Sequence, residues 1–244
     1  MDNLVLNLLV FNQDVTEGKL QKELIEKGMN LGFKALEIRR EYFKDIQKEA
    51  AEIKKLVDDH HLELFYSVPD EVFVNGEINP KLVDYLEEAK ILGVKHIKWN
   101  IGDFANFKGN LSTLNQLTNK GIEINIENDQ TQVSGKMKAI HEFMKAVQKE
   151  EVAIGYVYDL GNWRFVGEHE EEAAKLLAPF VTYVHVKDVE EVNHQKRAVK
   201  LDSGEIKWRS VLEMLPNDVP VAIEYPTETS EEIIEAKKLL EECF

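Results

Sequence analysis

The sequence predicts a single-domain (β/α)8 barrel over residues 1–244, and three observations lead to that fold class. Short runs rich in β-branched and aromatic residues alternate with longer amphipathic patterns along the whole chain, as in βαβ units of a parallel sheet. Eight such runs occur, and their starts lie about 30 residues apart, the usual length of one βα unit. A chain of 244 residues that is 43% hydrophobic has the usual size of this barrel.

The strands follow one another with regular spacing. Each expected strand is short and is bounded by turn residues or by a helix pattern. We expect the strands at residues 4–11, 34–39, 62–68, 94–100, 121–127, 153–159, 182–187 and 220–224.

Between the strands, apolar residues recur three and four positions apart, which is typical of helices with one face on a core. Asn79-Pro80 and Gly93 delimit a helix over residues 81–92, and the acidic residues after Gly167 begin another. An open doubly wound sheet is the alternative fold. The segment after the first strand, residues 11–18, holds one glycine and no Gly-x-Gly-x-x-Gly pattern, which favours the barrel.

Composition excludes several classes of function. The 45 acidic against 30 basic residues give a formal charge of −15, which disfavours binding to nucleic acid. Cys243 is the one cysteine, so no internal disulfide can form and a reducing cytoplasm fits. No apolar run approaches the roughly 20 residues of a membrane span, so we expect no membrane anchor. The composition leaves homo-oligomer formation open.

The last four strands each end in a residue that can bind a metal: Glu127, Asp159, His185 and Glu224. Active sites of such barrels lie at the carboxyl ends of the strands, so these side chains should converge. Alternation along a strand places Glu127 on the same face as Asn125 and opposite Ile126. Three carboxylates buried together would repel one another, so we expect one divalent metal ion among them, with Mn, Co, Mg or Zn suited to three oxygens and one imidazole.

At these residues the sequence resembles the xylose isomerase-like barrel superfamily of sugar isomerases and epimerases, which also contains AP endonuclease family 2. The motifs that carry the resemblance run in order along the second half of the chain. They are Glu127-Asn128, the turn 158–162 (Tyr-Asp-Leu-Gly-Asn), the segment 185–188 (His-Val-Lys-Asp), the segment 204–208 (Gly-Glu-Ile-Lys-Trp), and Glu224.

The resemblance implies that Glu127, Asp159, His185 and Glu224 bind one divalent metal, and that Glu127 and Glu224 act as the acid and base. The implied chemistry is proton transfer beside a carbonyl, through a metal-stabilised enediolate of a carbohydrate. Isomerisation, epimerisation and loss of water from a keto-inositol all remain open. Whether the substrate carries a phosphate group is also open. The candidate hydrogen-bond donors to such a phosphate are Ser203, Gly204 and Lys187.

Two departures from the family pattern bear on function. Asn162 stands where many members have a second histidine, and the end of strand three, Ser67-Val68-Pro69, lacks the histidine of the multi-zinc repair enzymes. With the negative charge, these departures argue against a zinc nuclease. A catalytically silent barrel that binds a carbohydrate or a partner protein is the rival class, supported by Asn162 and by loops that look too short to form a lid.

Further residues are candidates for substrate binding by their position near strand ends. Lys187 shares a face with His185, and Asn162 and Trp163 follow Asp159, with Trp163 able either to stack on a sugar or to pack in the core. Two pairs of residues, each pair on the same face of a strand near its end, could line the mouth of the barrel: Lys98 with Asn100, and Glu37 with Arg39.

Overall fold

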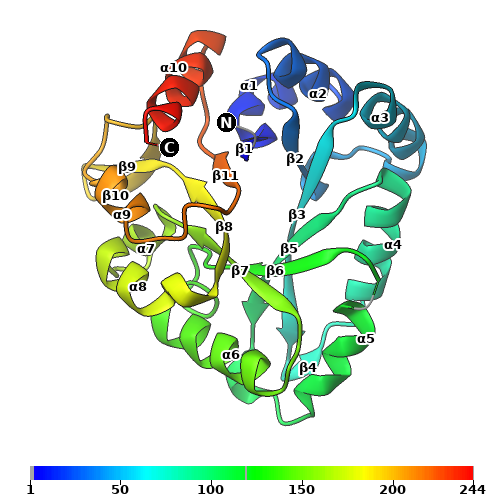
Figure 1. The fold of residues 1–244 in the computed structure, drawn as a ribbon, viewed down its shortest axis with the longest axis vertical. Coiled ribbons are helices and arrows are strands. Elements are labelled where there is room, and N and C mark those ends of the chain that lie inside the picture. Colours follow the sequence, from blue (N-terminus) through cyan, green and yellow to red (C-terminus); the bar gives the residue numbers. More distant parts are fainter. Residues whose placement is uncertain (1–2, 119, 244) are drawn as a thin grey trace.

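Eight parallel strands close into a barrel, which confirms the predicted fold class. The computed structural model describes residues 3–118 and 120–243. Each strand pairs with the next one around the ring, and β11 pairs with β1 to close it. In Figure 1 the helices surround these strands on the outside. The barrel strands are β1 (Leu4–Asn7), β2 (Ala35–Arg39), β3 (Glu63–Val74), β5 (His96–Gly102), β6 (Glu123–Glu127), β7 (Ile154–Asp159), β8 (Val181–Val186) and β11 (Val221–Ile223).

The helices begin and end largely where the sequence predicts. Helix α4 stops at Gly93, which adopts a left-handed φ of 75°. The first strand is shorter than expected, because the side chain of Asn7 caps a 3-10 turn over Leu8–Phe11. None of the described helices is both long and apolar enough to cross a bilayer. The helices are α1 (Asn12–Thr16), α2 (Gln21–Asn30), α3 (Ile46–His60), α4 (Leu82–Leu92), α5 (Asn115–Thr118), α6 (Met137–Lys149), α7 (Asn162–Phe165), α8 (Glu170–Leu177), α9 (Trp208–Leu212) and α10 (Ser230–Glu241).

Two hairpins beyond the carboxyl ends of the strands were not predicted. Strand β3 continues to Val74 and pairs with β4 (Glu77–Ile78), and β9 (Asp188–Val192) pairs with β10 (Gln195–Val199). The second hairpin turns at Asn193 and His194, which both have positive φ. Our expectation of short loops was therefore wrong: the β9–β10 segment is highly charged and looks like a loop in sequence, but it forms strands, and β3 continues past its expected end with Val72 and Phe73 buried.

The core consists of two separate clusters, and they confirm the predicted alternation. Ile124 and Ile126 belong to the large cluster between strands and helices. A small cluster inside the barrel contains Val157 and Ala222, which share faces with Asp159 and Glu224. The full inner set is Val5, Ala35, Phe65, Val157, Tyr183 and Ala222. The candidate site therefore stands directly above a packed apolar floor.

Two glycines allow a matched test of how the β3 extension is held against β5. Gly102 and Gly121 have φ of +72° and +73°, but a Cβ on Gly102 would lie 2.2 Å from the carbonyl oxygen of Phe73, whereas one on Gly121 would meet nothing within 4 Å. We expect both alanine variants to carry a left-handed strain of about 1–2 kcal/mol. Gly102→Ala should lower the free energy of unfolding by about 1–3 kcal/mol more, because backbone must move. Urea unfolding measures both, and equal losses would contradict this account.

Candidate metal centre

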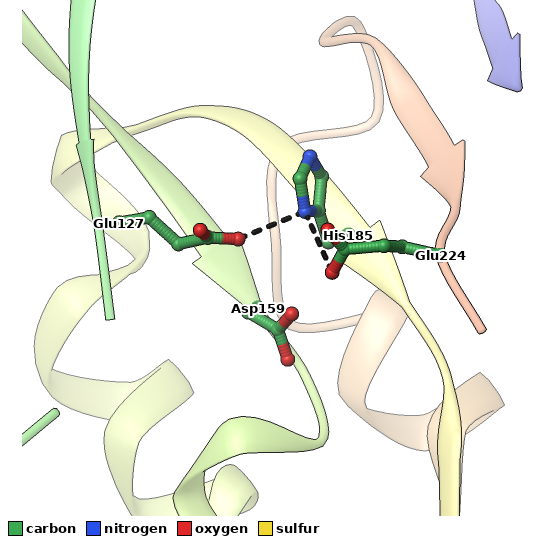
Figure 2. Close-up of side chains that lie close together, drawn as sticks. All are labelled: Glu127, Asp159, His185 and Glu224. Atoms are coloured by element: carbon green, nitrogen blue, oxygen red, sulfur yellow. Dashed lines mark ion pairs between the residues drawn. The ribbon is translucent and has the colours of Figure 1, made fainter. Parts of the chain in front are cut away.

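Four side chains from four neighbouring strands meet at the carboxyl end of the barrel. Glu127 and Asp159 are the last residues of β6 and β7, His185 lies near the end of β8, and Glu224 directly follows β11. All four are buried, and one potential ligand atom from each lies within 4.8 Å of the others. Figure 2 shows Glu127 and Glu224 on opposite sides of the imidazole of His185, with Asp159 alongside. The predicted convergence is thus present in the structure.

The atoms that face one another in this cluster suit a cation. Nδ1 of His185 lies 2.9 Å from Oε1 of Glu127 and 3.1 Å from Oε2 of Glu224 (Figure 2). Both Nδ1 of His185 and Oε1 of Glu127 are fully buried. The two atoms are close, but neither has a partner in hydrogen-bond geometry. When Nδ1 carries no proton, both atoms are buried acceptors without a donor, which is costly, and a divalent ion would satisfy them. Three carboxylate oxygens and one imidazole nitrogen could hold such an ion, and the set does not determine which metal it is.

Three cationic side chains surround the cluster, and each is paired with a carboxylate. Lys187 Nζ lies 2.6 Å from Oδ2 of Asp159 and 2.7 Å from Oε2 of Glu224. Arg39 donates from Nη1 to Oε1 of Glu224 at 3.0 Å. Lys98 donates to Oε2 of Glu127. Lys98 and Arg39, expected at the mouth, and Lys187, expected on the same face as His185, therefore all reach the cluster itself, where they neutralise its carboxylates.

The pKa values of the side chains in the cluster are shifted in different directions. Burial raises the pKa of Asp159 to about 7. Burial has the same effect on Glu127, but the ammonium of Lys98 and the imidazole of His185 outweigh it and lower the pKa of Glu127 to about 2. Burial would lower the pKa of His185, but the surrounding carboxylates, Glu37 foremost, raise that pKa well above its ordinary value. Near neutral pH, Asp159 and His185 are therefore the groups that hold protons in the absence of an ion.

The turn after β7 is organised by an amide. The side chain of Asn128 accepts from the backbone N–H of Asp159 and donates to its carbonyl oxygen, both at 2.9 Å. Asn162 donates to the carbonyl oxygen of Asn128 at 2.8 Å, and its own Oδ1 accepts from Gln130 and, at 3.5 Å, from Lys187. Asn162 therefore borders the site but serves mainly to join two loops.

Trp163 does not occupy the position expected for stacking on a sugar. Its side chain is fully buried, and its ring packs against Tyr158 with centroids 5.8 Å apart. Of the two alternatives for this residue, core packing is the one that the structure supports, because no face of the ring is open to a ligand.

Asn7 contacts the cluster and was missed by the sequence analysis. It donates from Nδ2 to Oε1 of Glu224 at 3.0 Å, across the junction of β1 and β11. One signal was available: Asn7 is a polar residue inside the first apolar run. Glu37 was considered only as a residue of the mouth, but its side chain is fully buried beside His185.

Comparison with known proteins agrees with the barrel fold. Residues 25–243 match the model of the xylose isomerase-like TIM barrel family. The chain belongs to this family. None of the curated proteins with which it was compared matches it by sequence.

Solved structures share the fold at low sequence identity. The IolI protein with a bound zinc atom has a TM-score of 0.73 at 17% identity, covering 99% of this chain and 97% of that chain. The probable 3-DHS dehydratase AsbF from Bacillus anthracis has a TM-score of 0.73 at 14% identity, covering 98% of each chain. D-psicose 3-epimerase from Clostridium cellulolyticum H10, solved with D-tagatose, has a TM-score of 0.64 at 13% identity, covering 98% of this chain and 97% of that chain.

Metal uptake by this cluster should be coupled to proton release. Because the pKa values of Asp159 and His185 are raised, protons compete with the ion below neutral pH, and each ion should displace at least about one proton. The apparent affinity for zinc should therefore rise from about pH 6 to about pH 8. Calorimetric titration in buffers of different ionisation enthalpy measures the release, and uptake without protons, unchanged across this range, would contradict the prediction.

Proposed function

We propose that this protein is a divalent-metal-dependent sugar isomerase or epimerase that acts by proton transfer beside a carbonyl group. The observation that carries the proposal is the arrangement of the two glutamates. Each has one oxygen anchored by a cation, Glu127 by Lys98 and Glu224 by Arg39, while its other oxygen faces the imidazole of His185. Two carboxylates held on opposite sides of one cluster suit the removal and return of a proton.

The residues take distinct roles in this proposal. Asp159 and His185 hold the metal together with the two glutamates, and the bound ion supplies polarisation of the substrate carbonyl, which acidifies the neighbouring C–H. Glu127 and Glu224 remove and return the proton. Lys98, Lys187 and Arg39 keep the glutamates ionised and oriented; Lys187, with Asn162 beside it, is also placed to contact a substrate oxygen.

The similar structures support this class of reaction without selecting a member of it. Two of them are an epimerase solved with a sugar and a protein with a bound zinc atom. A third is a probable dehydratase, so loss of water from a keto-inositol-type substrate is the second candidate reaction. A silent carbohydrate-binding barrel has less support, because the cluster keeps a complete set of metal-binding atoms.

Partner and compartment follow from charge and composition. We propose a small carbohydrate as the partner rather than nucleic acid, since a formal charge of −15 repels phosphate backbones. A reducing cytoplasm fits a chain whose one cysteine, Cys243, is free.

The loop after β8 supports a substrate without a phosphate group. Barrels of this kind often bind phosphate through backbone N–H groups near the ends of the last two strands. Here the N–H groups of Val189, Gly204 and Ile206 donate to the buried carboxylate of Asp188, at 2.8, 2.8 and 2.9 Å. Lys187 is likewise bound to Asp159 and Glu224. The backbone donors of this loop are thus already bound to the carboxylate of Asp188, and the charge of Lys187 is balanced by Asp159 and Glu224.

Solvent exchange tests the reaction. Metal-loaded protein in deuterium oxide should incorporate deuterium beside the carbonyl of one member of a panel of free ketoses and inososes. Glu127→Gln and Glu224→Gln should each slow this exchange by at least about 100-fold, because each removes one proton-transfer group. Glu123→Gln, at the opposite end of the same strand as Glu127, serves as the matched control. Metal content of every variant is measured alongside, and full exchange by Glu224→Gln would contradict the assignment.

A paired panel tests the substrate class. Free ketoses and the same ketoses carrying a terminal phosphate are compared by exchange rate with the metal-loaded protein. We expect the free sugar of the responding pair to exchange at least about 10-fold faster by kcat/KM, because the backbone donors of the Gly204 loop are bound to Asp188 and a phosphate would meet buried carboxylates. A preference for the phosphorylated member would overturn this substrate class and leave the reaction type intact.

A further inference from the structure

Glu37 is a buried carboxylate to which the proposed reaction gives no role. It lies in β2, on the opposite side of His185 from the metal-binding atoms, and its exposed fraction is 0%. The apolar cluster inside the barrel lies directly below it and includes Phe65 and Tyr183. Burying an ionised group beside such a floor is costly, and an apolar side chain would pack there without that cost. The carboxylate therefore calls for a specific explanation.

Glu37 contacts the imidazole of His185 and the hydroxyl of the neighbouring Tyr183. Its Oε2 lies 2.9 Å from Nε2 of His185 and accepts a hydrogen bond of 2.5 Å from the hydroxyl of Tyr183. Tyr183 and His185 are two positions apart on β8, so both side chains face the barrel interior. Their rings meet edge to face with centroids 4.7 Å apart. Lys98 Nζ lies 3.9 Å from the other oxygen of Glu37. The imidazole is thus held by Glu37 at Nε2 and by the ring of Tyr183.

The chemistry of these atoms fixes which nitrogen can bind a metal. An ionised carboxylate only accepts hydrogen bonds, so Nε2 of His185 must carry the proton that it shares with Glu37. A neutral imidazole then has its lone pair on Nδ1. Nδ1 is the nitrogen that faces Glu127 and Glu224, at 2.9 and 3.1 Å. One hydrogen bond therefore determines both the tautomer and the orientation of the ring.

We propose that Glu37 is a positioning residue that selects Nδ1 of His185 as the metal-binding atom and increases its strength as a ligand. The inference rests on the proposed metal-dependent function. A carboxylate that accepts from the far nitrogen of a metal-binding histidine typically changes metal affinity by 10- to 100-fold when it is removed.

The test is Glu37→Gln, which keeps the shape of the side chain but offers a carboxamide that can present either an acceptor or a donor to Nε2. The control is Glu170→Gln, because Glu170 is equally buried and ion-paired, with Arg164, away from the cluster. We expect Glu37→Gln to weaken zinc binding by roughly 10- to 100-fold by calorimetry, and Glu170→Gln to leave zinc affinity within about 2-fold of wild type. Glu37→Asp, whose shorter side chain draws the carboxylate away from Nε2, should weaken zinc binding similarly and replaces Glu37→Gln if that variant fails to fold.

A second readout separates positioning from a structural role. Heteronuclear NMR of the zinc-loaded protein reports which nitrogen of His185 carries a proton. Wild-type protein should show a protonated Nε2 and a metal-bound Nδ1, and Glu37→Gln should lose the defined signal of that tautomer. Lowered stability of the metal-free variant with unchanged zinc affinity and an unchanged tautomer would overturn the role of Glu37. Wild-type protein that takes up neither zinc nor cobalt would overturn the metal site itself, and this inference with it.

Discussion

The central constraint on this protein is the burial of four carboxylates at one end of a closed barrel. Parallel strands bring all of their carboxyl ends to the same rim, so acidic residues that end several strands must share a small volume. Three cationic side chains lie among them, which leaves one formal negative charge in excess if the imidazole is neutral. The carboxylates belong to Glu37, Glu127, Asp159 and Glu224, and the cations to Lys98, Lys187 and Arg39.

That charge balance also explains why the hydrogen-bond donors and the lysine beside the site bind carboxylates of the protein itself. Barrels often use backbone donors and lysines near the last strands for the anionic part of a ligand. In this chain Asp188 takes the donors of the Gly204 loop, and Lys187 is bound to Asp159 and Glu224. Cations and donors therefore serve the protein's own carboxylates. Within this cluster, buried atoms that lack a hydrogen-bond partner, Oε1 of Glu127 and Nδ1 of His185, face the space between Glu127, His185 and Glu224.

The sequence predicted the parts of the fold and site that depend on local periodicity. Strand positions follow from β-rich runs, and the inward direction of Glu127, Asp159 and Glu224 follows from alternation along each strand. What sequence could not provide is pairing across the barrel. The contact of Asn7 with Glu224 joins residues 217 positions apart, and the hairpin at residues 188–199 forms from charged residues whose stability comes from pairing rather than from a hydrophobic pattern.

Lysines can neutralise buried carboxylates without any metal, and this is the strongest physical argument for a silent barrel. It fails on the geometry of the unsatisfied atoms. If Lys98 and Lys187 were the whole compensation, each carboxylate oxygen at the centre would accept a hydrogen bond from one of them. Lys187 does bind the inner oxygen of Glu224, but Lys98 binds the outer oxygen of Glu127, and neither lysine donates to the inner oxygen of Glu127, which faces Nδ1 of His185. Holding Nε2 of the same ring against Glu37 directs Nδ1 toward those oxygens, so the centre of the cluster has a place for a metal ion, or for a proton on Nδ1 when no ion is bound.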